Sequence, residues 1–470
     1  MKITLINPPA KHTIQSWQPK ALEEGLDFLP PLGLMYLAGY LEQRSSHQVE
    51  ILDAQVNQLS YSQLAESIQQ KAPDVVGITA MTFTLVDVME TARLVKKINP
   101  ATKVVLGGPH VIIYPEETMQ NLDIDFLILG EGEEPFRQLL ENIGQPEKLA
   151  ATKNLVFRQG EKIINNQQTD FIQNLDALPF PARHLTPYQK YFSVLSANRP
   201  VTTMFTSRGC PYKCVFCDRP HLGKMFRARS AQNVVEEMKQ CQQMDIREIF
   251  IYDDTFAVDR QRVLDICEGI QEQKIKLAWD IRTRVNTVDR EVLTALKKAG
   301  CQRIHYGVEA GTQRILNLLK KGITLEQVKK AFALTKKLGI QTVGYFMIGS
   351  PTETKKDILQ TIKLMKKLNP DYVHIAITTP FPATELYTWA KQERVITSDP
   401  WQGFSRHPNS RFVPPVWEKE LSRQQLNTLL KKAYRSFYFS PGFILKQIAK
   451  LKSPREFLNK AKAALKLLKI

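Results

Sequence analysis

Cysteine is scarce in this chain, with six residues among 470, and none of them precedes Cys210. There is no second cysteine pair of the kind that completes the common four-ligand zinc sites. The apolar run at residues 2–6 predicts a buried strand and is too short for a signal peptide, so disulfide bonds are not expected. No uninterrupted apolar stretch approaches the roughly 20 residues that span a bilayer. These absences favour a cytoplasmic protein.

The length of 470 residues exceeds what one ordinary hydrophobic core supports, and it predicts two or three domains. Hydrophobic residues make up 43% of the chain and charged residues 24%, which are the proportions of a folded globular protein. The net charge of +17 has a meaning only once its location is known.

Three of the six cysteines, Cys210, Cys214 and Cys217, follow one another with the spacing C-x3-C-x2-C. Thiolates are preferred ligands of iron–sulfur clusters. Because a [4Fe–4S] cube contains four irons, three cysteines leave one iron open to an outside ligand, as in metal centres that keep a free position. Zinc usually takes two separated pairs or a mixed set of Cys and His. The spacing therefore predicts a cluster with one open iron.

Residues 1–145 alternate short apolar runs with patterns of helical period. This alternation predicts an α/β domain with a doubly wound parallel sheet, whose ligands lie at the carboxyl ends of the strands. Glycines in the strand-end loops at 107–108 and 130–132 let a ligand approach the backbone closely. The expected strands are 2–6, 49–52, 75–79, 104–106 and 126–129, and the expected helices are 34–42, 61–71, 85–98 and 115–121.

Residues 146–199 contain a predicted hairpin around Gln159-Gly160-Glu161 and then Leu178-Pro-Phe-Pro181. The prolines indicate a linker. Its function is not apparent from the sequence.

Strand–helix alternation resumes over residues 200–390 and gives about six β/α units, a partial or full parallel barrel. The remaining cysteines, Cys241, Cys267 and Cys301, fall in apolar patterns and are expected to be buried thiols. The expected strands are 202–206, 248–252, 277–280, 303–308, 341–348 and 372–376. The expected helices are 230–244, 260–273, 290–299, 324–338 and 354–368.

Chemistry in barrels lies at the carboxyl ends of the strands. One rim is therefore expected to carry the three cysteines together with Asp253, Asp254, Arg282, Arg284, Glu309 and the segment 349–353. Two structural alternatives stay open from the residues alone. Asp254 or Thr255 could cap a helix, and the two arginines, whose planar forks suit a carboxylate, could instead form structural salt bridges.

The C-x3-C-x2-C motif after a short strand resembles the signature of the radical S-adenosylmethionine superfamily. The resemblance implies that the open iron is chelated by the amino and carboxylate groups of S-adenosylmethionine, which the reduced cluster cleaves to a 5′-deoxyadenosyl radical. It makes Cys210, Cys214 and Cys217 the cluster ligands, and it requires an external electron donor such as flavodoxin or ferredoxin.

The same resemblance assigns other residues to the S-adenosylmethionine site. Phe216 matches the aromatic position against adenine, and Asp253-Asp254 match residues that hold the methionine ammonium. Glu309, in Gly307-Val-Glu-Ala-Gly311, matches a cofactor-site glutamate, and Gly349 belongs to a segment, 344–353, that resembles the one along adenine. Arg282 and Arg284 suit the methionine carboxylate.

The first domain resembles the cobalamin-binding domain that precedes such barrels. The resemblance implies that Thr79 to Thr82 and Gly107-Gly108 line the nucleotide tail of cobalamin. The Asp-x-His-x-x-Gly motif that supplies a histidine to cobalt is absent, since His12 lacks both the preceding Asp and the following Gly. His12 is therefore not expected to bind cobalt, and His110 is expected to be an ordinary loop histidine.

The implied activity is a cobalamin-dependent radical methyltransferase that methylates an unactivated carbon of a small molecule, such as a lipid or a tetrapyrrole. A radical oxidative cyclase is the main alternative, because the layout and the segment 433–441 also resemble the anaerobic magnesium-protoporphyrin monomethyl ester cyclases. A cobalamin-binding sensor or carrier is an alternative of another class. Methylthiotransferases are disfavoured, since they carry a second cluster on N-terminal cysteines.

The last segment, residues 391–470, is expected to be a helical basic extension. From Lys446 onward it holds eight basic residues against the single acid Glu456, beside apolar residues at helical spacing. Such a helix suits peripheral contact with an anionic membrane surface, the inner face of the cell membrane, or it packs on the barrel with solvated lysines. Nucleic acid has no supporting motif and is not an expected partner.

Overall fold

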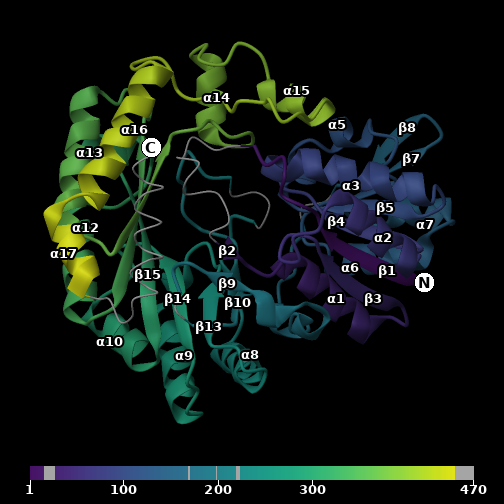
Figure 1. Cartoon of the computed structure of the whole chain (residues 1–470), viewed down its shortest axis with the longest axis horizontal. Coiled ribbons are helices and arrows are strands. Elements are labelled where there is room, and N and C mark those ends of the chain that lie inside the picture. Colours follow the sequence, from purple (N-terminus) through teal and green to yellow (C-terminus); the bar gives the residue numbers. More distant parts are fainter. Residues whose placement is uncertain (15–26, 168–169, 197, 219–222, 450–470) are drawn as a thin grey trace.

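The computed structural model describes residues 1–14, 27–167, 170–196, 198–218 and 223–449. Two α/β units lie side by side, the first in purple and blue and the second in teal and green (Figure 1). Helices α14 and α15 lie along the top of this view, between the two units.

In the described part of the chain, the first sheet has seven strands in the order β3-β1-β4-β5-β6-β7-β8. The first five run parallel, as the alternation of strands and helices predicts, and the last two are antiparallel. The strands are β1 (Lys2–Asn7), β3 (Gln48–Asp53), β4 (Val75–Thr79), β5 (Lys103–Gly107), β6 (Phe126–Ile128), β7 (Leu155–Gln159) and β8 (Lys162–Asn165).

Helices cover both faces of this sheet, because alternate side chains along each strand point to opposite faces. Ile78 and Leu106 pack on the face of α2 and α3, whereas Val75 and Val105 pack on the face of α1 and α6. The helices are α1 (Leu32–Arg44), α2 (Tyr61–Lys71), α3 (Leu85–Ile98), α4 (Pro109–Ile113), α5 (Pro115–Met119), α6 (Glu133–Asn142) and α7 (Pro146–Ala151). The predicted doubly wound fold is confirmed.

The hairpin of β7 and β8 lies inside the segment 146–199 that the prolines assign to a linker. Its turn falls at Gly160, as predicted, but β7 pairs with β6 and so extends the first sheet. Pairing with β6 buries Leu155, Val156 and Phe157. This part of the segment therefore contributes to the core of the first unit, and the domain limits stay predictions.

The second sheet has six parallel strands in chain order among the described residues, β10-β13-β14-β15-β16-β17. Since β10 and β17 do not pair with each other, the barrel is partial. Its strands are β10 (Val201–Met204), β13 (Glu248–Ile251), β14 (Ala278–Thr283), β15 (Cys301–Glu309), β16 (Gln341–Ile348) and β17 (Tyr372–Ile377). Its helices are α8 (Ala231–Gln243), α9 (Arg260–Glu272), α10 (Arg290–Lys298), α11 (Gln313–Leu318), α12 (Leu325–Lys337) and α13 (Lys355–Leu368).

The C-terminal helices are α14 (Glu385–Gln392), α15 (Pro400–Arg406), α16 (Arg423–Tyr438) and α17 (Pro441–Ala449). Helix α16 covers the free edge of β17. The Tyr434 hydroxyl accepts a hydrogen bond from Ile375 N (3.0 Å) and donates to Ile375 O (2.9 Å), and Tyr438 does the same at Val373 (3.1 and 2.9 Å). Two tyrosines one helical turn apart thus provide hydrogen-bond partners for the backbone N–H and C=O groups of a strand edge that has no neighbouring strand.

Tyr438→Phe is expected to lower the free energy of unfolding by about 1–3 kcal/mol, because it leaves a buried backbone N–H and C=O of Val373 without partners. Urea unfolding measures the difference. Tyr372→Phe is the matched control, since this tyrosine lies on β17 and is only partly buried. Equal loss in both variants would contradict the role of Tyr438.

No helix among the described residues has the length and apolarity to cross a bilayer. The predicted basic tail begins near the end of α17, and its residues 450–470 lie outside the described residues. Membrane contact through this tail stays a prediction.

Candidate active site

The carboxyl ends of the two sheets face each other. Phe83, in the loop after β4, packs edge-on against Phe381 and Trp401 of the second unit, with ring centroids 5.7 and 6.4 Å apart. Tyr114 donates a hydrogen bond to Asp399 (3.1 Å), next to α15. Ligand sites lie at such strand ends in both fold types. We therefore expect the ligands to bind in the space between the two units.

Buried ion pairs join the units on another side of this space. Arg208, on the short strand β11 (Ser207–Arg208), donates to Glu131 (2.9 Å) in the loop after β6 and to Glu133 (2.5 Å), the first residue of α6. Arg227, on β12 (Arg227–Ala228), also pairs with Glu131 (2.9 Å). Burial disfavours the charges, but the opposite charges prevail: they lower the pKa of Glu131 and raise that of Arg208. We call this group the interdomain ion-pair cluster.

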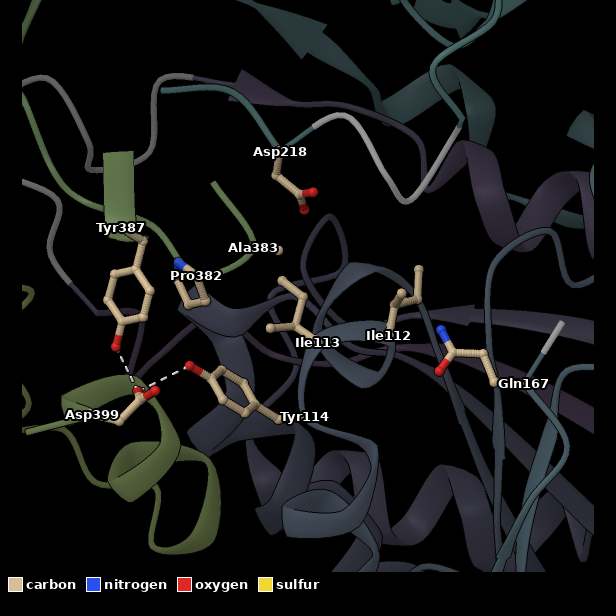
Figure 2. A pocket seen from close by; sticks show the side chains of 9 residues that line it. All are labelled: Ile112, Ile113, Tyr114, Gln167, Asp218, Pro382, Ala383, Tyr387 and Asp399. Carbon is tan, nitrogen blue, oxygen red and sulfur yellow. Dashed lines mark hydrogen bonds between the residues drawn. The ribbon is translucent and has the colours of Figure 1, made fainter. Parts of the chain in front are cut away.

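A cavity of about 380 Å³ lies between the units (Figure 2). Ile112, Ile113 and Tyr114 line it from the first unit, and Pro382 and Tyr387 line it from the second. Figure 2 shows Tyr114 and Tyr387 both pointing at Asp399, and Asp218, the residue after Cys217, across the cavity from them. The cysteine segment therefore adjoins this cavity.

The three predicted cluster ligands lie together on the loop 209–218, the cysteine loop. Backbone hydrogen bonds at Val215 hold this loop between the ends of α11 and α14, to Leu319 O (3.2 Å) and from Leu386 N (2.9 Å). Cys214 is buried, Cys210 partly buried and Cys217 exposed. The predicted burial of Cys241, Cys267 and Cys301 is confirmed.

Partial desolvation, followed by the charges of Asp254, Cys214 and Cys210, raises the pKa of the Cys217 thiol to about 12. Without a metal the Cys217 thiol thus favours its protonated form, and metal binding would displace that proton. Within the described residues no three His, Cys, Asp or Glu side chains converge on a single-ion site. In a cluster each cysteine ligates its own iron, so three soft sulfur donors on one loop fit this group.

Glu309 reaches the cysteine loop through a lysine that the sequence did not indicate. Its carboxylate pairs with Lys321 Nζ (2.7 Å), both residues are buried, and Lys321 Nζ lies 5.9 Å from the centre of the Phe216 ring. Glu309 has a φ of 68° at a break in the pairing of β15 with β16, a strained conformation that redirects its side chain. Lys321 follows Lys320 in the sequence, and nothing in the sequence distinguishes it from an ordinary solvent-exposed lysine.

The two adjacent aspartates have different roles. Asp253 is fully buried and accepts hydrogen bonds from the backbone and hydroxyl groups of Thr206 and Ser207, at 2.5–3.1 Å. It therefore anchors the chain between β10 and the cysteine loop, and a role of this pair in holding a ligand ammonium stays a prediction. Of the two alternative helix caps, Thr255 does lie at the N-cap position of the short 3-10 helix Phe256–Val258, but its side chain makes no capping hydrogen bond, and Asp259 caps α9.

Neither predicted arginine forms an ion pair among the described residues. Arg284 Nη1 lies 3.7 Å from Cys214 Sγ, and its guanidinium stacks on Tyr212 at 3.8 Å. Arg282 stacks on Tyr252 at 3.9 Å and donates to Ile251 O (3.2 Å). The salt-bridge alternative is not observed, and the structure brings Arg284, but not Arg282, into contact with the cysteine loop.

Backbone conformation and packing explain why a glycine stands at position 349. Its φ is 80°, and a Cβ atom there would lie 2.8 Å from Leu426 of α16. Three positions on, at Thr352, the backbone is again left-handed. Glu353 closes this turn by accepting from Ser350 N (2.9 Å), while its Oε1 is buried without a partner among the described residues.

Glu353 gives a pH-dependent prediction. Burial raises the pKa of its carboxyl from the usual 4.5 to about 7, so the folded state retains a proton that the unfolded state has lost. This contribution to stability is complete below about pH 4.5, falls as the pH rises through about 7, and amounts to roughly 3 kcal/mol. Glu353→Gln is therefore expected to gain stability relative to the wild type between pH 5 and pH 8. Urea unfolding at both values measures this, the exposed Glu268→Gln is the control, and an unchanged difference would contradict it.

The predicted cobalamin-side residues also lie together at one sheet edge. Thr79 and Gly107 are register partners, and Gly108, at φ 111°, lies so close to Ala80 that a Cβ atom would be 2.8 Å from its carbonyl. Thr82 Oγ1 hydrogen-bonds His110 Nδ1 (3.1 Å). Burial lowers the pKa of His110 to about 3, which keeps it neutral, and its Nε2 has no partner in the described residues.

Family models and relatives agree with this geometry. A model of the B12 binding domain matches residues 24–140, and one of the radical SAM superfamily matches residues 204–365. An uncharacterized methyltransferase of Pyrococcus horikoshii is 36% identical over 452 residues, which cover 95% of each chain. The chain belongs to the cobalamin-dependent radical S-adenosylmethionine enzymes. An anaerobic magnesium-protoporphyrin IX monomethyl ester cyclase of Rubrivivax gelatinosus is 29% identical over 91% of this chain and 77% of its own length.

The fold of this radical S-adenosylmethionine enzyme has a solved counterpart. The cobalamin-dependent S-adenosylmethionine radical enzyme OxsB, with aqua-cobalamin bound, superposes with a TM-score of 0.77 over 99% of this chain and 72% of OxsB. Its sequence identity is 18%, so the comparison shows a shared fold. The predicted family, fold and cofactors (a [4Fe–4S] cluster, S-adenosylmethionine and cobalamin) are confirmed at the level of the family, and the roles of single residues stay predictions.

Proposed function

We propose that this enzyme methylates an unactivated carbon of a small molecule. The supporting observation is that the cysteine loop and the Thr82/Gly108 edge adjoin the same space between two facing sheets. When bound, the cluster and S-adenosylmethionine supply a 5′-deoxyadenosyl radical, and cobalamin supplies the methyl group. The chain's own residues must hold these groups and keep water away.

The barrel residues divide these tasks. Cys210, Cys214 and Cys217 hold the cluster. Lys321 pairs with Glu309 and positions its side chain beside the cysteine loop, where a carboxyl group suits the polar groups of S-adenosylmethionine. Arg284 Nη1 lies next to Cys214 Sγ and so positions this sulfur within the cysteine loop.

The walls of the space combine apolar and aromatic side chains with the polar Gln167, Asp218 and Asp399. Phe83, Phe381 and Trp401 exclude water on one side, and Ile112, Ile113 and Pro382 line the cavity. This lining favours an apolar substrate, and we propose a lipid or a tetrapyrrole. The electron for S-adenosylmethionine cleavage is proposed to come from a flavodoxin or a ferredoxin.

The test uses the full chain, reconstituted without air with iron, sulfide and cobalamin, and a chemical reductant. Turnover with methyl-labelled S-adenosylmethionine is expected to form S-adenosylhomocysteine and 5′-deoxyadenosine and to place label in an acceptor from an extract. Failure to bind cobalamin would contradict the methylation proposal and would leave the radical barrel unaffected.

An oxidative cyclase is the second candidate, and the relative from Rubrivivax gelatinosus supports it. The labelled methyl group distinguishes the two, because a cyclase forms 5′-deoxyadenosine and leaves no label in its product. Since the family is one of enzymes, the sensor or carrier alternative is disfavoured.

A further inference from the structure

His12 lies in the loop after β1, at the same sheet edge as Thr82 and Gly108. Two residues further on, Ile14 N donates to Phe83 O (2.9 Å), which fastens this loop to the one after β4. In a doubly wound sheet this edge is where the ligand lies. The position of His12 is therefore that of a residue facing the cofactor.

Its imidazole is held by a buried carboxylate. His12 Nδ1 lies 2.9 Å from Asp87 Oδ1, and the backbone N of His12 donates to Asp87 Oδ2 (2.8 Å). Asp87 is fully buried in the first turn of α3, and it also accepts from the Tyr61 hydroxyl (2.5 Å). The rings of His12 and Tyr61 stack at 6.2 Å. These contacts restrain both the plane and the rotation of the imidazole.

The carboxylate also determines which ring nitrogen carries the proton. A carboxylate oxygen accepts, so Nδ1 carries the proton in this hydrogen bond and the lone pair of the ring lies on Nε2. This nitrogen has no hydrogen-bond partner among the described residues, and the side chain is 42% exposed. A histidine that donates one N–H to a carboxylate and presents its other nitrogen is the usual arrangement of a metal ligand.

His110 and His184 also have polar side-chain partners, but each lacks one of these features. His110 lies at the correct edge, but its Nε2 is enclosed by protein. His184 pairs with Glu42 (3.0 Å), but Glu42 lies near the end of α1, at the opposite edge of the sheet. His12 combines position, orientation and an accessible nitrogen.

We propose that His12 Nε2 is an axial ligand of the cobalt in bound cobalamin. The sequence-based expectation denied it this role, because no aspartate precedes it within a motif. The structure supplies the carboxylate from α3, 75 residues later in the chain. The chemistry fits, since imidazole nitrogen is a good ligand of first-row transition metals. Asp87 and Tyr61 are positioning residues for this ligand.

The test is electron paramagnetic resonance of cob(II)alamin bound to the full chain, in samples with natural and with nitrogen-15-labelled histidine. Ligation by His12 is expected to split each cobalt line into a triplet that becomes a doublet in the labelled protein. His12→Ala should remove the splitting, and added imidazole should restore it. Asp87→Asn should lower cobalamin affinity about 10- to 100-fold.

His184→Ala is the matched control and should keep the labelled doublet. A triplet that survives labelling would mean that the benzimidazole base of cobalamin is the ligand, and would overturn the proposal. Absence of nitrogen splitting in the wild type, or a doublet that persists in His12→Ala, would also overturn it. Each of these three outcomes leaves the methylation proposal standing. A protein that binds no cobalamin would contradict both the ligand proposal and the methylation proposal.

Discussion

Replacing Cys214 by alanine is expected to abolish the iron–sulfur absorption band and to reduce S-adenosylmethionine cleavage to background. Of the three thiols on the cysteine loop, Cys214 is the buried one, and Arg284 points at its sulfur. Two remaining cysteines cannot hold a cube that already leaves one iron open, so the loss should be complete. Absorption spectra and iron content after anaerobic reconstitution measure it, together with 5′-deoxyadenosine formation.

Cys267→Ala is the matched control, because this buried thiol lies on the outer helix α9. It should keep the full iron content and activity, with a loss of stability of about 1 kcal/mol from the removed sulfur. A Cys214→Ala protein that retains four irons and cleaves S-adenosylmethionine would contradict the assignment. Zinc in place of iron in the wild type would do so as well.

Replacing Arg208 by alanine is expected to lower the free energy of unfolding by about 3–5 kcal/mol. The substitution removes the guanidinium that pairs with Glu131 and Glu133 and leaves Glu133 buried without that cation. Arg227 still pairs with Glu131, so the loss should fall mainly on Glu133. Because this cluster joins the first unit to the strand before the cysteine loop, proteolysis between the units should also accelerate.

Arg247→Ala serves as the control for Arg208→Ala. Arg247 is exposed and pairs only with Asp245 (3.3 Å), so its removal should change stability by no more than about 0.5 kcal/mol. In the Arg208→Ala background, Glu133→Gln should cost less than it does in the wild type, since the two residues share one interaction. Additive losses would show that the ion pair does not couple the units.

The periodicity of the sequence predicts most of the two sheets, because burial on one or both faces leaves a pattern in neighbouring residues. The strand 75–79 and the helices 61–71 and 85–98 have the predicted limits. The hairpin around Gly160 was predicted as a hairpin, but its pairing with β6 was not. The local pattern of apolar residues predicts that a strand forms, but it does not indicate which strand will pair with it.

The site was less accessible to prediction for the same reason. Its three cysteines lie close together in the sequence, and their spacing is recognisable by itself. Asp253 and Asp254, by contrast, cannot be distinguished in the sequence, and only the hydrogen bonds from Thr206 and Ser207 to Asp253 separate their roles. Lys321 acquires its role only through Glu309, and His12 only through Asp87. Such pairings join residues far apart in the chain, and a single sequence contains no record of them.

Helix α16 also covers a strand border through which another chain would otherwise pair. A chain that ends before Arg423 would present the N–H and C=O groups of Val373 and Ile375 as a bare strand border. Unpaired borders recruit strands from other molecules. The two tyrosines therefore occupy, with their hydroxyl groups, the backbone donors and acceptors through which another strand would pair.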